Sequence, residues 1–162
     1  MQAGNQRGWH AQQQAPIRTI SDVWGKPYLA GGYFDERGNL RPELVEREPL
    51  ERLAREMAQD RPSLTSTQVR RYFGHCRAIE TQILAESERD RHEKWLGCYK
   101  DLMITDAVAA KAREPGKEKI PQLFADYITI NVKAAKTSKD FLEGFIYHFE
   151  ALVGFGSQHF KK

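Results

Sequence analysis

Apolar side chains recur at helical spacing along most of the chain. After a turn at residues 35–39, this spacing predicts a first helix from near Pro49 to about Asp60, with Pro49 in the first turn, where no amide proton is needed. Residues 65–68 have the Thr-x-x-Gln spacing of a capping box, which predicts the start of a second helix. The inward stripe of that helix consists of Val69, Tyr72, Phe73, Cys76, Ile79 and Ile83.

Three more helices are predicted towards the end of the chain. The third spans roughly residues 92–113, and the fourth begins near Pro121. A second capping-box pattern at residues 137–140 opens the last helix, which stops near Gly154 and Gly156. The inward positions of the third helix are Trp95, Leu96, Tyr99, Met103, Ala107 and Ala110.

The start of the chain differs from the rest. Residues 1–15 are rich in Gln, Gly and Asn, and they contain few large apolar side chains. Residues 17–34 place aromatic side chains between glycines. For the aromatic residues from Trp24 to Phe34 two alternatives stay open, docking on a neighbouring subunit or packing on their own bundle.

The predicted architecture is all-α. No segment alternates with period two, so no sheet is predicted. The sequence predicts a compact bundle of about five helices, residues 35–162, behind a flexible N-terminal arm, residues 1–34. A length of 162 residues suits one domain.

Composition excludes several classes of protein. No apolar run approaches the roughly 18 residues that a membrane span needs, and the first residues lack the basic-then-apolar pattern of a secretory signal. Two cysteines, Cys76 and Cys98, are too few for a disulfide scaffold. We therefore expect a cytoplasmic protein with no membrane partner.

No pattern points to catalysis, to a cofactor or to a metal. His75 and Cys76 are adjacent, and adjacent residues point about 100° apart on a helix. His92 and Cys98 also fall on different faces, and no CxxC or HxxxH pattern occurs. Nothing favours Asp90 and His92 as an acid–base pair over coincidence. The sequence predicts no enzyme, no cofactor and no metal site.

The basic residues are more informative, although the net charge is only +3. Arg70 and Arg77 are seven residues apart on one face of the second helix, away from its apolar stripe, with Arg71 beside them. Spaced cations of this kind can neutralise the phosphates of a nucleic acid. The alternative is an ordinary solvated helix surface. Lys100 and Lys111 share a face of the third helix, and that face continues through Arg113, Lys117 and Lys119.

Three stretches together resemble a known family. They are residues 32–44, residues 64–73 and residues 138–153, and the similarity extends over about residues 32–155. They resemble the small subunit of the type III-A CRISPR effector complex, the Csm complex. One departure from the family is the long polar connection at residues 86–94.

The resemblance implies a function. Members of this family are helical bundles without nuclease activity, and several copies stack along a ribonucleoprotein filament beside the backbone subunit that cleaves target RNA. They line the groove that holds guide RNA and target RNA, and they contact the sugar-phosphate backbone without reading its sequence. Arg70 and Arg71 match the family's basic position at the start of the second helix. The resemblance therefore implies Arg70 and Arg71 as RNA-binding residues. Four further candidates rest mainly on the helical-face argument: Arg77, Lys100, Lys111 and Arg113.

We expect a non-catalytic, RNA-binding structural subunit of the type III-A interference complex that acts in antiviral defence. Its expected partners are guide RNA, target RNA, the backbone and large subunits of the effector, and other copies of itself. Three alternatives stay open. They are the small subunit of a related CRISPR effector, a helical protein-interaction or scaffold module with no RNA role, and an enzyme.

Overall fold

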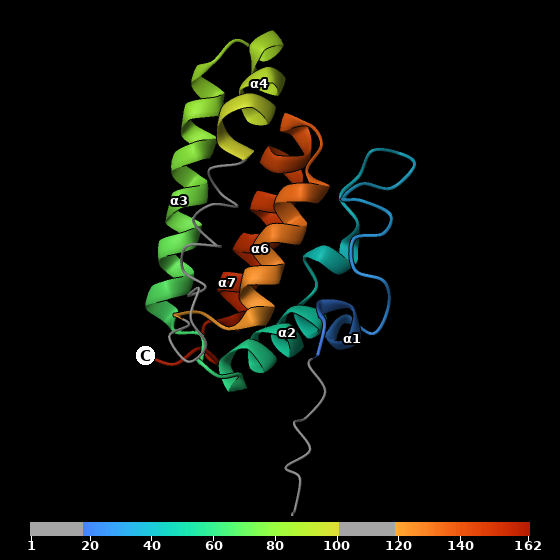
Figure 1. Cartoon of the computed structure of the whole chain (residues 1–162). Helices are drawn as coiled ribbons and strands as arrows, with labels where there is room; N and C mark the ends of the chain where they lie inside the picture. Colours follow the sequence, from blue (N-terminus) through green and yellow to red (C-terminus); the bar gives the residue numbers. More distant parts are fainter. Residues whose placement is uncertain (1–17, 101–118) are drawn as a thin grey trace, which may run out of the picture.

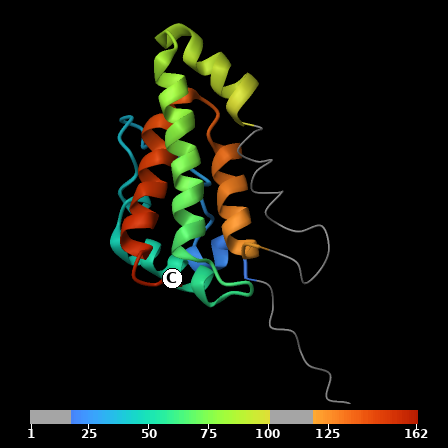
Figure 2. The ribbon, with the colours of Figure 1, turned by 90° about the vertical axis from the view of Figure 1, so that its left-hand side faces the viewer.

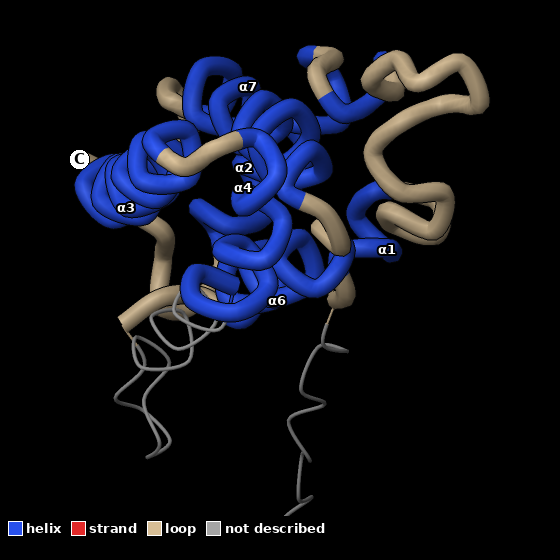
Figure 3. Tube along the Cα trace, turned by 90° about the horizontal axis from the view of Figure 1, so that it is seen from above, coloured by secondary structure: helices blue, strands red, loops and turns tan. Residues whose placement is uncertain are grey.

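The computed structural model describes residues 18–100 and 119–162. These ranges form helices and loops without a strand, which confirms the all-α fold (Figure 3). Two isolated bridges, Phe34–Leu40 and Thr65–Lys161, are the extended pairings within them. The helices of at least seven residues are α2 (Arg47–Gln59), α3 (Ser66–Ala85), α4 (Glu88–Lys94), α6 (Gln122–Ala134) and α7 (Ile146–Gly156). The shorter segments are α1 (Ile20–Trp24), the 3-10 turn η1 (Pro42–Leu44), and the π-helical η2 (Trp95–Tyr99) and η3 (Asp140–Phe145).

Three long helices form the body of the bundle. Helices α3, α6 and α7 run side by side (Figure 1), and α3 lies in front of the other two when the molecule is turned (Figure 2). Helix α2 crosses their lower end and packs against α7, with α1 beside it (Figure 1). Helix α4 folds back at the far end of α3 (Figure 1).

The core is filled by aromatic rings at helical spacing. Phe145 and Phe149 are fully buried and stack with their centroids 5.7 Å apart. Phe124 and Tyr127 of α6 pack against this pair. The rings of Tyr127 and Phe149 are in edge contact, with their centroids 5.5 Å apart. Each ring removes a large apolar surface from water, so the aromatic stripes of α6 and α7 fix how these two helices face one another.

Both predicted capping boxes form. At α3, the Gln68 amide donates to Oγ1 of Thr65 at 3.2 Å, and the Thr65 amide donates to Oε1 of Gln68 at 3.0 Å. At the start of the last helix, the Asp140 amide donates to Oγ1 of Thr137 at 3.0 Å, and the Thr137 amide donates to Oδ2 of Asp140 at 3.1 Å. These bonds satisfy amides that a helix start leaves unpaired, and they fix where each helix begins.

The prediction of a flexible arm is wrong for residues 20–34. This segment contains α1, and Trp24, Tyr28 and Tyr33 are buried in the core. The Tyr33 hydroxyl donates to the backbone oxygen of Asn131 at 2.9 Å. Of the two alternatives for the aromatic residues, the structure shows packing on their own bundle. Their rings are buried there, and the Tyr33 hydroxyl is hydrogen-bonded there. Residues 1–17 lie outside the described residues.

The third predicted helix begins earlier in the structure than the sequence predicts, and a π-helical turn interrupts it. Helix α4 already begins at Glu88, and the chain becomes π-helical from Trp95. The Trp95 indole stacks on Phe141 at 4.2 Å and donates to the carbonyl oxygen of Ala135 at 2.8 Å. Leu96, which lies within this π turn, is 42% exposed instead of facing inward. Tyr99 is half-buried against the core, and the remaining predicted inward positions, Met103, Ala107 and Ala110, lie outside the described residues.

Candidate nucleic-acid interface

Helix α3 presents the two arginines that the family resemblance favours. Arg70 and Arg71 are both exposed, and neither forms an ion pair with any residue in the ranges 18–100 and 119–162. The two side chains leave the helix about 100° apart. Arg70 lies on the side of Ser66, four residues earlier, and Arg71 lies on the side of Gln68, three residues earlier. The two arginines therefore place positive charge on two adjacent faces at the start of α3.

Arg77 shares the side of Arg70, as its spacing predicts, but its charge is already compensated. Its guanidinium lies 2.8 Å from Oε2 of Glu80, one turn further along α3. Between the two arginines lies Gly74, where an added Cβ would meet no atom within 4 Å. Among the described residues, this side of α3 therefore has space at Gly74, with Arg70 at one end and Arg77, paired with Glu80, at the other.

The structure does not bring Lys100 together with these arginines. Lys100 is half-buried and directly follows η2, which lies with α4 beside the end of α3, whereas Arg70 lies near the start of α3 (Figure 1). Lys111 and Arg113 lie outside the described residues. The proposed face of the third helix thus stays a prediction.

Two lysines from distant segments flank the start of α3. The Ser66 amide donates to the carbonyl oxygen of Lys161 at 2.7 Å, and the Lys161 amide donates to that of Leu64 at 3.3 Å. On the other side of the helix, the Gln68 side-chain amide donates to the carbonyl oxygen of Lys119. Both lysine side chains are exposed. We call the residues Arg70, Arg71, Lys119 and Lys161 the basal cluster.

Lys161 is the member that sequence analysis missed. Its place beside α3 depends on pairing between residues far apart in the chain, and no local pattern reports such pairing. The sequence places Lys119 after a predicted loop, on the basic face of the third helix. It does not predict that Lys119 lies next to Gln68. Backbone oxygens of both lysines accept hydrogen bonds from α3, which places the two residues beside that helix.

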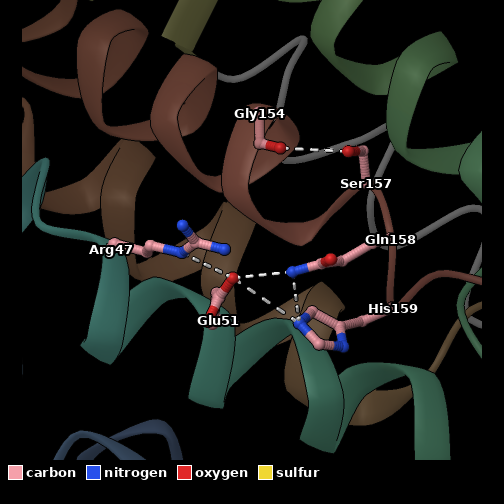
Figure 4. Close-up of polar contacts among 6 residues, drawn as sticks. All are labelled: Arg47, Glu51, Gly154, Ser157, Gln158 and His159. Atoms are coloured by element: carbon pink, nitrogen blue, oxygen red, sulfur yellow. Dashed lines mark hydrogen bonds and ion pairs between the residues drawn. The ribbon is translucent and has the colours of Figure 1, made fainter.

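The segment that carries Lys161 is fixed to α2. The Glu51 carboxylate accepts hydrogen bonds from Nε of Arg47 at 2.9 Å and from the Gln158 side chain at 2.7 Å (Figure 4). The hydrogen bond from Arg47 is the main cause that holds the pKa of Glu51 below its usual value. Phe160 then packs into the core against Gly156. Lys161 therefore projects from a fixed backbone.

The polar residues of this region lack the geometry of a catalytic site. Nε2 of His159 lies 3.9 Å from Oε1 of Glu51, which is too long for a hydrogen bond (Figure 4). Cys76 is buried among apolar side chains, and burial raises the pKa of its thiol. Across residues 18–100 and 119–162, His, Cys, Asp and Glu nowhere gather in a group of three that would hold a metal ion. The arrangement supplies positioned positive charge.

No helix in the described part of the chain combines the length and the apolar character that crossing a membrane requires.

Comparison with known protein families gives a match. The family model described as Csm2 Type III-A matches residues 45–162. The match includes α3 and the whole basal cluster, whereas α1 and η1 precede it. No curated protein and no solved structure matches the chain.

Proposed function

Because the chain belongs to the Csm2 type III-A family, and is thus a structural subunit of the type III-A CRISPR complex, we propose that it holds RNA in that complex through the basal cluster. In this role the protein contacts the sugar-phosphate backbone of guide RNA and target RNA without reading sequence. The observation that carries the proposal is the convergence of three segments that place unpaired cations around the start of α3.

Ion pairing distinguishes the basal cluster from several other cations of the described ranges. A cation paired with a carboxylate has little net charge to offer, whereas an unpaired cation can neutralise a phosphate and release its counterion. In the described ranges, no member of the basal cluster has a carboxylate partner. The arginines and lysines with a carboxylate partner in these ranges are Arg18, Lys26, Arg47, Arg52, Arg77, Arg89, Lys94 and Lys139.

The composition of the surface favours backbone contact over base recognition. Reading or stacking RNA bases requires exposed aromatic rings or polar groups aimed at base edges. Among the large apolar side chains exposed in the described ranges, the aromatic one is Tyr147 on α7, and α3 contributes only Leu84. Phosphate contacts position a nucleic acid without carrying sequence information. A uniform contact of this kind suits a subunit that must accept any guide sequence.

The proposal places the protein in the cytoplasm as a non-catalytic component of antiviral interference. Assembly into the complex with other subunits follows from the family. We propose the backbone subunit, the large subunit and further copies of this chain as its neighbours. Protein contacts of that kind raise the effective concentration of RNA at the subunit, so a few phosphate contacts suffice.

The test is charge reversal at the two arginines. We expect Arg70→Glu combined with Arg71→Glu to weaken RNA association equally for unrelated sequences and to flatten its salt dependence. Lys133→Glu with Lys136→Glu is the matched control, because both lysines are exposed at the opposite end of the bundle, beside the Ala135 carbonyl that binds Trp95. Wild-type affinity and salt slope in the arginine variant would contradict the proposal and favour a protein-interaction role without RNA.

A further inference from the structure

A groove lies next to the basal cluster, on the side of Lys161. It has a volume of about 420 Å³ and runs between the end of α2, the loop before α3 and the segment that carries Lys161. Four of its six lining residues are polar or cationic, which makes it unlike a pocket for an apolar ligand. The lining residues are Ala58, Gln59, Arg61, Pro62, Ser63 and Lys161.

Two exposed cations face this groove from different segments. Arg61 comes from the loop before α3, Lys161 comes from the segment fixed to α2, and in the described residues neither has a carboxylate partner. The acid beside them is Asp60, whose Oδ1 accepts from the Arg61 amide at 2.8 Å. The Ser63 hydroxyl donates to the Asp60 carbonyl oxygen at 3.2 Å. These bonds stabilise the loop from within and leave the Arg61 guanidinium and the Lys161 ammonium group available to a ligand.

The groove lies beside the start of α3. The Lys161 carbonyl oxygen is bonded to the Ser66 amide, and Arg70 lies four residues further on the same side of the helix. At 1.5 Å per residue, four residues advance about 6 Å along the helix axis. Lys161 therefore links the groove to the start of α3, and Arg70 and Gly74 lie further along that helix.

We propose that this groove binds a phosphodiester group of the RNA, so that one strand runs from the groove along the Arg70 side of α3. The inference rests on the proposed function and adds Arg61 and Lys161 to the RNA contacts. Arg61 offers a planar pair of donors to phosphate oxygens, and Lys161 offers a point charge from the opposite wall. Because both belong to a fixed backbone, RNA binding has to order their side chains but not the chain that carries them.

The experiment compares full-length variants for binding to single-stranded RNA of mixed sequence, across a range of salt concentrations. Arg61→Gln with Lys161→Gln removes the two groove cations, and Lys133→Gln with Lys136→Gln is the control with the same change of charge. Each lost phosphate contact reduces the salt slope by about 0.7 for a single strand. We therefore expect the affinity loss between about 50 and about 200 mM salt to become roughly sevenfold smaller in the groove variant, and to stay unchanged in the control.

The variants separate failure of this inference from failure of the proposed function. If Arg70→Gln with Arg71→Gln weakens RNA binding while the groove variant keeps the wild-type slope, the groove is not an RNA contact and the proposed function stands. If neither variant changes the slope, both proposals fall. A thermal unfolding midpoint equal to that of the wild-type protein establishes that the groove variant is folded, which we expect because Lys161 is held by its backbone.

Discussion

The Tyr28 hydroxyl group donates a hydrogen bond to Nε2 of His148 at 2.6 Å. The other ring nitrogen, Nδ1, lies 2.6 Å from the carbonyl oxygen of Leu44, which can only accept, so Nδ1 carries the proton. The Tyr28 oxygen in turn accepts from Nδ2 of Asn131 at 2.9 Å. This buried chain of hydrogen bonds joins the segment before α2 to α6 and α7.

We expect Tyr28→Phe to lower the free energy of unfolding by about 1–3 kcal/mol. The substitution leaves Nε2 of His148 buried without its donor, and an unsatisfied buried polar group costs that much. Urea denaturation measures the change. Tyr147→Phe is the control, because Tyr147 is 47% exposed and its loss of a hydroxyl should change stability by less than about 0.5 kcal/mol. Equal effects of the two substitutions would contradict this account of the buried network.

The same network predicts a loss of stability in acid. Burial lowers the pKa of His148 from 6.5 to about 4, although the hydrogen bond to Leu44 opposes this shift. Between these two pKa values the unfolded chain binds a proton that the folded chain does not, so stability falls as the pH falls. The contribution is complete above about pH 6.5 and declines by about 3 kcal/mol towards pH 4.

Measuring the free energy of unfolding from about pH 7 to about pH 4 tests this prediction. His148→Gln removes the titrating group, so the gap in stability between the wild-type protein and the variant should narrow as the pH falls. A constant gap over this range would show that His148 does not titrate as its burial implies.

Substitution by alanine should change the free energy of unfolding in opposite directions at two glycines, Gly74 and Gly144. At Gly74, in the middle of α3, an added Cβ meets no atom within 4 Å, so Gly74→Ala should raise the free energy of unfolding by about 0.5–1 kcal/mol. At Gly144 the Cβ would lie 2.6 Å from Cγ of Tyr33, so Gly144→Ala should lower it by about 1–3 kcal/mol. Chemical denaturation of both variants measures the two changes in free energy of unfolding. Changes in the same direction at both positions would contradict the packing described here.

Releasing Arg77 from its partner should strengthen RNA binding. Glu80→Gln removes the carboxylate that lies 2.8 Å from the Arg77 guanidinium, which adds one available cation to the Arg70 side of α3. We expect the salt slope for single-stranded RNA to steepen by about 0.7. Glu143→Gln is the comparison, because it frees Lys139, whose ammonium group lies over the Phe34 ring and away from α3. An equal gain from both substitutions would indicate a general effect of net charge.

Local interactions explain what sequence analysis predicted correctly. The capping boxes at Thr65 and Thr137 each depend on two side chains three residues apart, so their patterns are visible in the sequence. The burial of Cys76 follows from its place in the apolar stripe of α3. The all-α fold follows from the same helical periodicity.

Long-range contacts explain what it did not predict. The π turn at Trp95 depends on the stack with Phe141 and on the Ala135 carbonyl, both distant in the chain. The glycine-rich segment around Tyr33 suggested flexibility, yet it is held by Asn131 of α6. For the candidate interface, the sequence supplied Arg70 and Arg71, but the place of Lys161 beside Ser66 required the fold.

Ultraviolet crosslinking of the native complex, purified through a tag on this subunit, tests the RNA-binding role most directly. Mass spectrometry of the digested complex then identifies the peptides that carry nucleotide adducts. The account predicts adducts on this chain in peptides from the first half of α3 and from the segment around Lys161, for guides of unrelated sequence. Recovery of the intact complex with adducts on other subunits and none on this chain would contradict it.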